Sequence, residues 1–433
     1  QATLTEPLEF DINTSQYFGY SVSISNDGMY AILGGTADDL RRRDGDGTSF
    51  SEQPETTTHH SDNGSVLVFK RKPDGTWEFM DKVVNPTHHS NSNSDNFGRS
   101  CAMSGDGRYM IIGTPYDDPE YSLVHHDDDT IVTDGGAAHI FIREASGKWA
   151  HQKELTDFRG VLGNSENFGW SVSIDNTGTY VAIGAKYDDR HTTNTGAAHI
   201  FKREGTIWNH MVEVTDWPRS LNNTSQEYFG ESVSISGDGK ILAVGAPGGH
   251  MPGKSRYNDG SQGYQDIDDT GKVHMFRRDG EEWVREQILT HYYLGDVSRY
   301  DRFGNDVAVS NDGNYVIVGA HQDEHAAATG INTHGVSHLF KRVDSLRPGA
   351  AVNIGSDSIL VWTYVERLYD PSPMGARING QTSQTSYGEF FGWSVAISGA
   401  GEYIVNGVPK NHITVNSSDV ADVGTVMVFT GVD

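Results

Sequence analysis

Polar and apolar positions alternate in short runs along the chain, and these runs recur. Tyr17–Gly35 reads YFGYSVSISNDGMYAILGG, in which SVSIS alternates small polar with apolar residues and YAIL is continuously apolar. The alternation predicts a strand with one buried face, and the apolar run predicts a strand covered on both faces. The Asn-Asp-Gly between them predicts a tight turn. Five similar segments begin near residues 96, 167, 228, 302 and 390.

Each repeat carries a second phrase that begins with Gly and contains Phe five residues later. These phrases are Gly64–Arg71, Gly136–Arg143, Gly196–Arg203, Gly271–Arg278, Gly335–Arg342 and Gly424–Thr430. A Trp that marks a further strand follows five of them, at Trp77, Trp149, Trp208, Trp283 and Trp362. Each repeat is therefore predicted to form a four-stranded antiparallel sheet, which cannot bury both faces alone. The sequence predicts an all-β fold, a six-bladed β-propeller that spans residues 1–433 as one domain.

The two chain ends predict how the ring closes. The sixth repeat stops just after its third strand, whereas Ala2–Asp11 lies where a fourth strand precedes every other Phe-Gly. We expect this N-terminal strand to complete the last blade, where Pro7 is tolerated at the outer edge. The alternative is that the segment joins the last blade of a neighbouring chain, which would build head-to-tail filaments.

The recurring Phe-Gly, Ser-Val-Ser strand, Gly-Asp-Gly turn and Gly-x-x-x-x-Phe phrase resemble the FG-GAP repeat family, which builds the propeller of integrin α-subunit heads. The resemblance implies an extracellular, non-catalytic interaction platform. Two features depart from that family: six repeats are present where integrin heads have seven blades, and the Asp-x-Asp-x-Asp-Gly calcium loop of many members is missing.

Charge and cysteine content narrow the function classes. Lys and Arg number 33 against 59 Asp and Glu, which gives a net charge of −26 and argues against nucleic acid as a partner. No run of about 18 apolar residues exists, so membrane insertion is not expected. The single cysteine excludes an internal disulfide, and Cys101 stands where the other repeats have Val, as a buried hydrophobe does.

Acidic residues follow the second strand at equivalent positions of four repeats. The group comprises Asp38, Asp39, Asp117, Asp118, Asp188, Asp189, Asp323 and Glu324. They open the rim that receives the variable insertions, where binding usually resides. One interpretation is a ring of carboxylates that gathers Ca²⁺, and the other is that each Asp caps the turn after its strand.

Two acidic loops are better local candidates for a cation. They contain Asp127, Asp128 and Asp129 in the second repeat and Asp266, Asp268 and Asp269 in the fourth. Flexible loops could fold several carboxylates round one Ca²⁺, although a solvated acidic loop has the same composition. Ca²⁺ is the cofactor that these acidic loops suggest.

Histidines are numerous, and four of them share one position in the third strand: His139, His199, His274 and His338. Leu67 and Met427 take that position in the other two repeats, so these histidines are expected to pack between blades rather than bind metal. Loop pairs such as His59-His60 lack a Cys or carboxylate at a recognised zinc spacing.

No nucleophile elbow, Walker loop, dinucleotide fingerprint or His-Glu-x-x-His motif occurs, so we expect no enzyme. Sequons at Asn13, Asn63, Asn222, Asn223 and Asn416, with Gln1 in place of Met, favour a processed extracellular glycoprotein. The predicted function is a structural subunit of a cell-surface or filamentous assembly, whose partners are other protein chains, including copies of itself, or glycans. The alternatives are a Ca²⁺-dependent lectin or adhesin that uses Trp170, Trp217 or Trp393, and a polysaccharide-active enzyme.

Overall fold

The computed structural model describes residues 4, 17–37, 63–86, 94–121, 130–131, 134–157, 165–190, 193–216, 226–256, 262–267, 269–291, 300–323, 335–346, 358–369, 390–409, 413–415, 418–420 and 424–430. These residues form strands, turns and bends, and none of them is helical. Accordingly, the described part of the chain contains no helix of the length and apolarity needed to cross a membrane.

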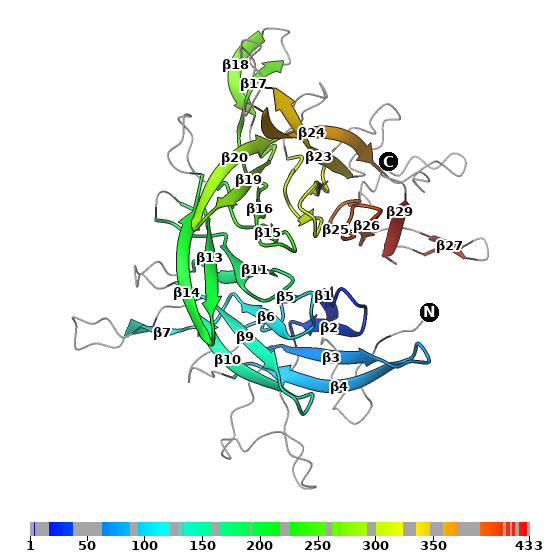
Figure 1. Ribbon diagram of the computed structural model, residues 1–433. Coiled ribbons are helices and arrows are strands. Elements are labelled where there is room, and N and C mark those ends of the chain that lie inside the picture. Colours follow the sequence, from blue (N-terminus) through cyan, green and yellow to red (C-terminus); the bar gives the residue numbers. More distant parts are fainter. Residues whose placement is uncertain are drawn as a thin grey trace. The chain divides into compact units, whose positions relative to one another are not determined.

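Six blades follow one another along the chain, and each is an antiparallel sheet with its strands in sequence order (Figure 1). The first contains β1 (Phe18–Ile24), β2 (Tyr30–Gly35), β3 (Ser65–Arg71) and β4 (Trp77–Val84). The second contains β5 (Ser100–Met103), β6 (Tyr109–Thr114), β9 (Ala137–Arg143) and β10 (Trp149–Leu155). The third contains β11 (Phe168–Ile174), β12 (Tyr180–Ala185), β13 (Ala197–Glu204) and β14 (Ile207–Val214).

The remaining blades continue the pattern. The fourth contains β15 (Ser232–Ile235), β16 (Ile241–Ala246), β19 (Lys272–Asp279) and β20 (Glu282–Leu289). The fifth contains β21 (Val307–Val309), β22 (Tyr315–Ala320), β23 (Val336–Leu346) and β24 (Ser358–Leu368). The sixth has three strands among the described residues, β25 (Ser394–Ile397), β26 (Tyr403–Val408) and β29 (Thr425–Thr430).

Three small hairpins lie between the second and third strands of their blades. They are β7 (Glu120–Tyr121) with β8 (Thr130–Ile131), β17 (Met251–Arg256) with β18 (Gln262–Ile267), and β27 (Ile413–Val415) with β28 (Ser418–Val420). The chain divides into two compact units, Gln1–Asp188 with Phe201–His210, and Asp189–Ile200 with Met211–Asp433.

The predicted all-β fold of six propeller blades is confirmed, and the predicted strands fall where the sequence placed them. Four insertions contain strands that the sequence did not predict. Three of them hold the small hairpins β7–β8, β17–β18 and β27–β28. In the fourth, residues 344–360, β23 continues through Leu346 and pairs directly with β24, which begins at Ser358. The closure of the ring by Ala2–Asp11 stays a prediction, since that segment lies outside the described residues apart from Leu4.

The Phe-Gly turn fixes each blade against its neighbour. In the second blade Asn96 and Gly98 have φ values of 55° and 90°, and Phe97 between them is fully buried. The Phe97 amide donates to the Asn63 carbonyl oxygen at 2.8 Å, and Phe97 forms a parallel bridge with Gly64 of the first blade. Glycine is required after the Phe because its left-handed backbone approaches the preceding blade too closely for a side chain.

The apolar core lies between successive blades. In the first unit, Val66 and Val68 of β3 pack in one cluster with Cys101 and Met103 of β5. In the second unit β19 and β21 pack in the same way. The third strand of one blade therefore covers the first strand of the next, as the two-sided apolar runs predicted. Cys101 is buried, and burial raises the pKa of its thiol to about 11, so it behaves as a hydrophobe.

The two end blades each expose a face that the other blades bury. Val22 and Ile24 of β1 are 66% and 56% exposed, whereas Cys101 and Met103 at the same repeat positions are 7% and 5% exposed. A Cβ on Gly19 would meet no atom within 4 Å. In the second unit, Val426 and Val428 of β29 are 68% and 60% exposed, although their equivalents in β3 are fully buried. Within its own unit, each of these two apolar faces has no described blade packed against it.

We predict that Gly169→Ala lowers the free energy of unfolding by about 3 kcal/mol or more. The added Cβ would lie 2.1 Å from the Ala137 carbonyl oxygen, so the backbone would have to move. Gly205→Ala is the matched control: it also has positive φ, 67°, but its Cβ would meet no atom within 4 Å. It should cost only about 1 kcal/mol. Urea denaturation of both variants measures the difference, and equal losses would contradict the close-approach argument.

Candidate functional site

Four polar positions recur where one blade meets the next, and we call each set a junction cluster. The first position lies one or two residues beyond the outer strand of the preceding blade, and the second is an acidic residue two positions before the Phe of Phe-Gly. The third lies in the turn after the second strand of the blade itself, and the fourth is the histidine of its third strand. The sets are Asn85, Asp95, Asp117 and His139 in the second blade; Asp157, Glu166, Asp188 and His199 in the third; Asp216, Glu227, Gly249 and His274 in the fourth; and His291, Asp301, Asp323 and His338 in the fifth. Among the fifteen side chains, all but Asp216 are buried.

The fifth-blade cluster pairs each histidine with a carboxylate. His291 Nε2 lies 2.7 Å from Asp301 Oδ2, and His338 Nε2 lies 3.3 Å from Asp323 Oδ2. The two imidazole rings are 5.6 Å apart, and the Phe303 ring stacks on His291. Burial lowers the pKa of His338, and the hydrogen bond that His338 donates to Asp323 opposes that effect. His338 is buried against the Phe303 ring, as the apolar residues at the same position of other repeats predicted.

The fourth-blade cluster has lost the Asp of the turn, where Gly249 stands, and has gained an internal lysine. Lys272 Nζ lies 3.5 Å from both Asp216 Oδ2 and Glu227 Oε2. Arg285 adds a contact of 3.0 Å to Asp216 Oδ1. Burial of an ionised carboxylate costs free energy unless a positive charge and hydrogen bonds compensate it. In this cluster the neighbouring lysine and arginine side chains supply both.

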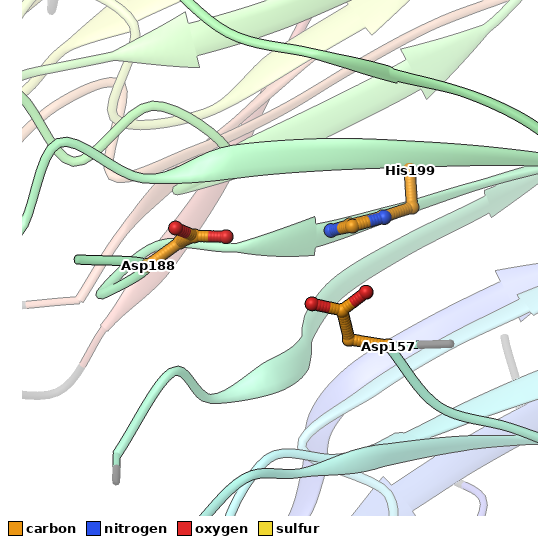
Figure 2. A group of neighbouring side chains, drawn as sticks. All are labelled: Asp157, Asp188 and His199. Atoms are coloured by element: carbon orange, nitrogen blue, oxygen red, sulfur yellow. The ribbon is translucent and has the colours of Figure 1, made fainter. Parts of the chain in front are cut away.

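The third-blade cluster has the side chains that metal ions prefer. Asp157, Asp188 and His199 offer ligand atoms that all lie within 4.8 Å of one another, and Figure 2 shows the two carboxylates and the imidazole turned toward a common point. Imidazole and carboxylate together suit zinc or manganese. Arg190 Nη2 donates to His199 Nε2 at 3.3 Å, and its Nη1 lies 2.9 Å from Glu213. The guanidinium therefore already places a positive charge beside this group.

The second-blade cluster contains the pair Asp117 and His139. The Oδ2 atom of Asp117 lies 3.7 Å from His139 Nε2, and both residues are fully buried. The other ring nitrogen, His139 Nδ1, lies 3.4 Å from His151 Nε2. Burial, assisted by repulsion from His139, lowers the pKa of His151 to about 4.

The predicted acidic rim needs correction at three positions. Asp117, Asp188 and Asp323 are buried in junction clusters and do not face a rim. The second residue of each pair is the one that caps the loop: Asp118 accepts a hydrogen bond from the Asp134 amide at 2.8 Å, and Asp189 accepts one from the Asn194 amide. Both bonds run to amides at the far end of the loop and not to the turn directly after the strand, so the turn-capping interpretation stays a prediction. Asp38, Asp39 and Glu324 lie outside the described residues.

The predicted calcium loops are mostly outside the described residues, as Asp127, Asp128, Asp129 and Asp268 are. Asp266 lies in β18, where it pairs with Pro252. The Oδ2 atom of Asp269 lies 3.8 Å from an Arg302 guanidinium nitrogen. Calcium binding by these loops stays a prediction.

One predicted glycosylation position conflicts with the structure. The Asn63 side chain is fully buried at the Phe-Gly turn of the second blade, which leaves no room for a glycan. The sequence predicts a loop at Asn63, and Asn63 does precede β3, which begins at Ser65, but its side chain points inward. Asn13, Asn222, Asn223 and Asn416 lie outside the described residues.

Sequence reasoning overlooked two of the four cluster positions. One of them could have been found in the sequence, because an acidic residue lies two positions before the Phe of Phe-Gly in five repeats: Asp95, Glu166, Glu227, Asp301 and Glu389. The residue after the outer strand varies between Asn, Asp and His, and only its position relative to the Trp strand identifies it.

Comparison with known proteins supports the repeat assignment. The sequence profile described as FG-GAP repeat matches residues 149–201 and 283–340. Both segments are FG-GAP repeats. Each extends from a Trp strand to the Phe of the next blade's Gly-x-x-x-x-Phe strand, so each spans one junction cluster. No curated protein matches the sequence.

Two solved structures are among those that resemble this chain over most of its length. Hydrazine synthase of Kuenenia stuttgartiensis has a TM-score of 0.42 and 10% identity, over 94% of this chain and 78% of that one. The periplasmic gluconolactonase PpgL of Pseudomonas aeruginosa has a TM-score of 0.35 and 12% identity, over 81% of this chain and 87% of that one.

Asp306 replaces the serine that other repeats have in the first strand. Its two carboxyl oxygens accept hydrogen bonds from the Val395 amide at 2.7 Å and from the Val307 amide at 3.0 Å, which ties the fifth blade to the sixth. Burial nevertheless dominates and raises the pKa of Asp306 to about 7. The folded chain therefore holds this proton more tightly than the unfolded chain does.

We predict that this carboxyl makes stability fall as pH rises. Between pH 4 and pH 7 the unfolded chain ionises Asp306 while the folded chain keeps it protonated, so the free energy of unfolding drops by up to about 1.4 kcal/mol per pH unit. Asp306→Asn removes this dependence and should gain stability relative to the wild type across that window. Urea denaturation at several pH values measures it, and parallel pH profiles would refute it.

Proposed function

We propose that the chain is a non-catalytic extracellular interaction protein, a subunit of a cell-surface or filamentous assembly built from copies of itself. The observation that carries this proposal is the pair of exposed apolar blade faces, Val22 with Ile24 on β1 and Val426 with Val428 on β29. Exposed contiguous apolar surface of this kind marks interaction sites in soluble proteins.

The occupant of each face is argued from the chain's own repeats. Within each unit, the first strand of a blade has a face that corresponds to the β1 face carrying Val22. The third strand of the preceding blade covers that face. The face equivalent to Val428 is covered by the first strand of a following blade. A second copy therefore offers the complementary surface to each end of the first, and such a head-to-tail contact builds a filament when its rotation does not close into a ring.

The test compares self-association of the purified full chain with that of two charge variants. Val22→Asp and Val428→Asp each place a carboxylate in the proposed contact and should lower the association constant by roughly 100-fold. Val284→Asp is the matched control, because Val284 on β20 is 45% exposed and belongs to neither face. Sedimentation velocity over a concentration series gives the association constant for each chain.

A different result would identify closure within one chain. If the wild type is a monomer at every concentration, and Val22→Asp and Val428→Asp lower its unfolding temperature while Val284→Asp does not, the two faces cover each other and the assembly proposal fails. That outcome would support the ring closure expected from the sequence.

A lectin activity is favoured by one side chain. Trp393 is 48% exposed, and its ring centroid lies 4.7 Å from that of His321 in a T-shaped contact. The exposed part of its indole could therefore contact a sugar ring. Trp170 is a poorer platform, since Arg99 and Lys186 lie 3.4 Å and 3.3 Å from its ring centre. Trp217 lies outside the described residues. A glycan array with wild type and Trp393→Ala, each with and without EDTA, should show binding that the variant loses; equal signals would exclude this site.

A further inference from the structure

Asp117 is an unusual carboxylate within the second-blade junction cluster. It is fully buried in the turn after β6, and neither of its oxygens has a hydrogen-bond partner. Among the described residues, His139 is the one cationic or potentially cationic side chain within 4 Å of it. An ionised carboxylate without compensation is rarely tolerated inside a protein, because burial removes its hydration.

His139 faces Asp117 in a way that a simple hydrogen bond does not explain. The 3.7 Å between Asp117 Oδ2 and His139 Nε2 exceeds hydrogen-bond length, and Nε2 has no other partner. When His139 Nδ1 donates its proton to His151 Nε2, 3.4 Å away, Nε2 keeps its lone pair. Two acceptor atoms then face each other inside the protein, and a positive charge between them would relieve their repulsion.

The spacing suits two ligands of one ion. Two atoms bound at 2.0–2.2 Å to a tetrahedral ion lie roughly 3.3–3.6 Å apart, close to the observed separation. A third donor, Thr114 Oγ1 at the end of β6, is also fully buried without a hydrogen bond. Thr114 pairs with Ala137 while Ile112 pairs with His139, so Thr114 and His139 share one face of the blade.

The fourth blade shows how the chain meets the same requirement without an ion. Lys272 stands at the repeat position of Ala137, and its ammonium bridges Asp216 and Glu227. That blade also has Gly249 at the position of Asp117. The blade with an internal ammonium has therefore lost the turn carboxylate, whereas the second blade keeps the carboxylate and has alanine at the lysine position.

We propose that Asp117 and His139 bind a divalent transition-metal ion of the Zn²⁺ class inside the second-blade junction, with Thr114 as a further oxygen donor. A mixed imidazole and oxygen set favours such an ion over Ca²⁺, which takes oxygen ligands. His151 holds the His139 ring as the outer partner of a metal-ligating histidine usually does. This site is separate from the blade faces of the proposed function and does not depend on them.

The experiment uses the full chain, stripped with a chelator and then titrated with Co²⁺ as a spectroscopic probe and with Zn²⁺. The wild type should bind one more equivalent of Co²⁺ than Asp117→Asn, with a visible absorption band that the variant lacks. Zn²⁺ should also raise the unfolding temperature of the wild type more than that of the variant. Asp118→Asn is the matched control, because Asp118 only caps the Asp134 amide.

Two further variants keep the proposal falsifiable if Asp117→Asn folds poorly. His139→Met should fold, since Met427 has that position in the sixth blade, and it should lose the same equivalent. Ala137→Lys copies Lys272 and should make the unfolding temperature insensitive to the chelator. Equal Co²⁺ stoichiometry and spectra in the wild type, Asp117→Asn and His139→Met would overturn the proposal and leave only metal bound elsewhere.

Discussion

A blade of this chain is stable only where another blade covers it. The second and third strands carry apolar side chains on both faces, and Val66, Val68 and Ile112 are fully buried between sheets. A single four-stranded sheet would leave both of these faces in water, at a cost of about 25 cal/mol for each Å² of apolar surface. Each blade therefore relies on its neighbours, and the Phe-Gly turn holds them at a fixed distance through a backbone contact that admits no side chain at Gly169.

The same contact explains why polar groups collect at the junctions. Residues that end strands of adjacent blades are brought together under the Phe-Gly turn, where water is excluded, and each blade compensates its carboxylates differently. Lys272 does so in the fourth blade and Arg190 lies beside the third-blade group, whereas the fifth blade relies on His291 and His338. Among the described residues, no lysine or arginine pairs with Asp117 in the second blade, and this is the position where we propose an external cation.

Much of the fold was predictable because its signals are local. The alternation in SVSIS, the Asn-Asp-Gly turn and the apolar run that follows specify a hairpin from a handful of neighbouring residues, and six copies predicted six blades. The candidate sites were less predictable. Asp117 and Asp118 look equivalent in sequence, yet one is buried beside His139 and the other caps a loop amide. The sequon at Asn63 likewise gave no sign that its amide is buried.

The amino-acid sequence by itself determined the strands, their order within each blade and the number of blades, because side-chain alternation and positive-φ turns act over a few residues. Only the tertiary structure decided which polar residues meet. Asn85, Asp95, Asp117 and His139 are far apart in sequence, and the packing of one blade on the next, rather than any local pattern, selects which of them lose contact with water. The chemistry of the junctions thus depends on burial, which a repeat motif does not encode.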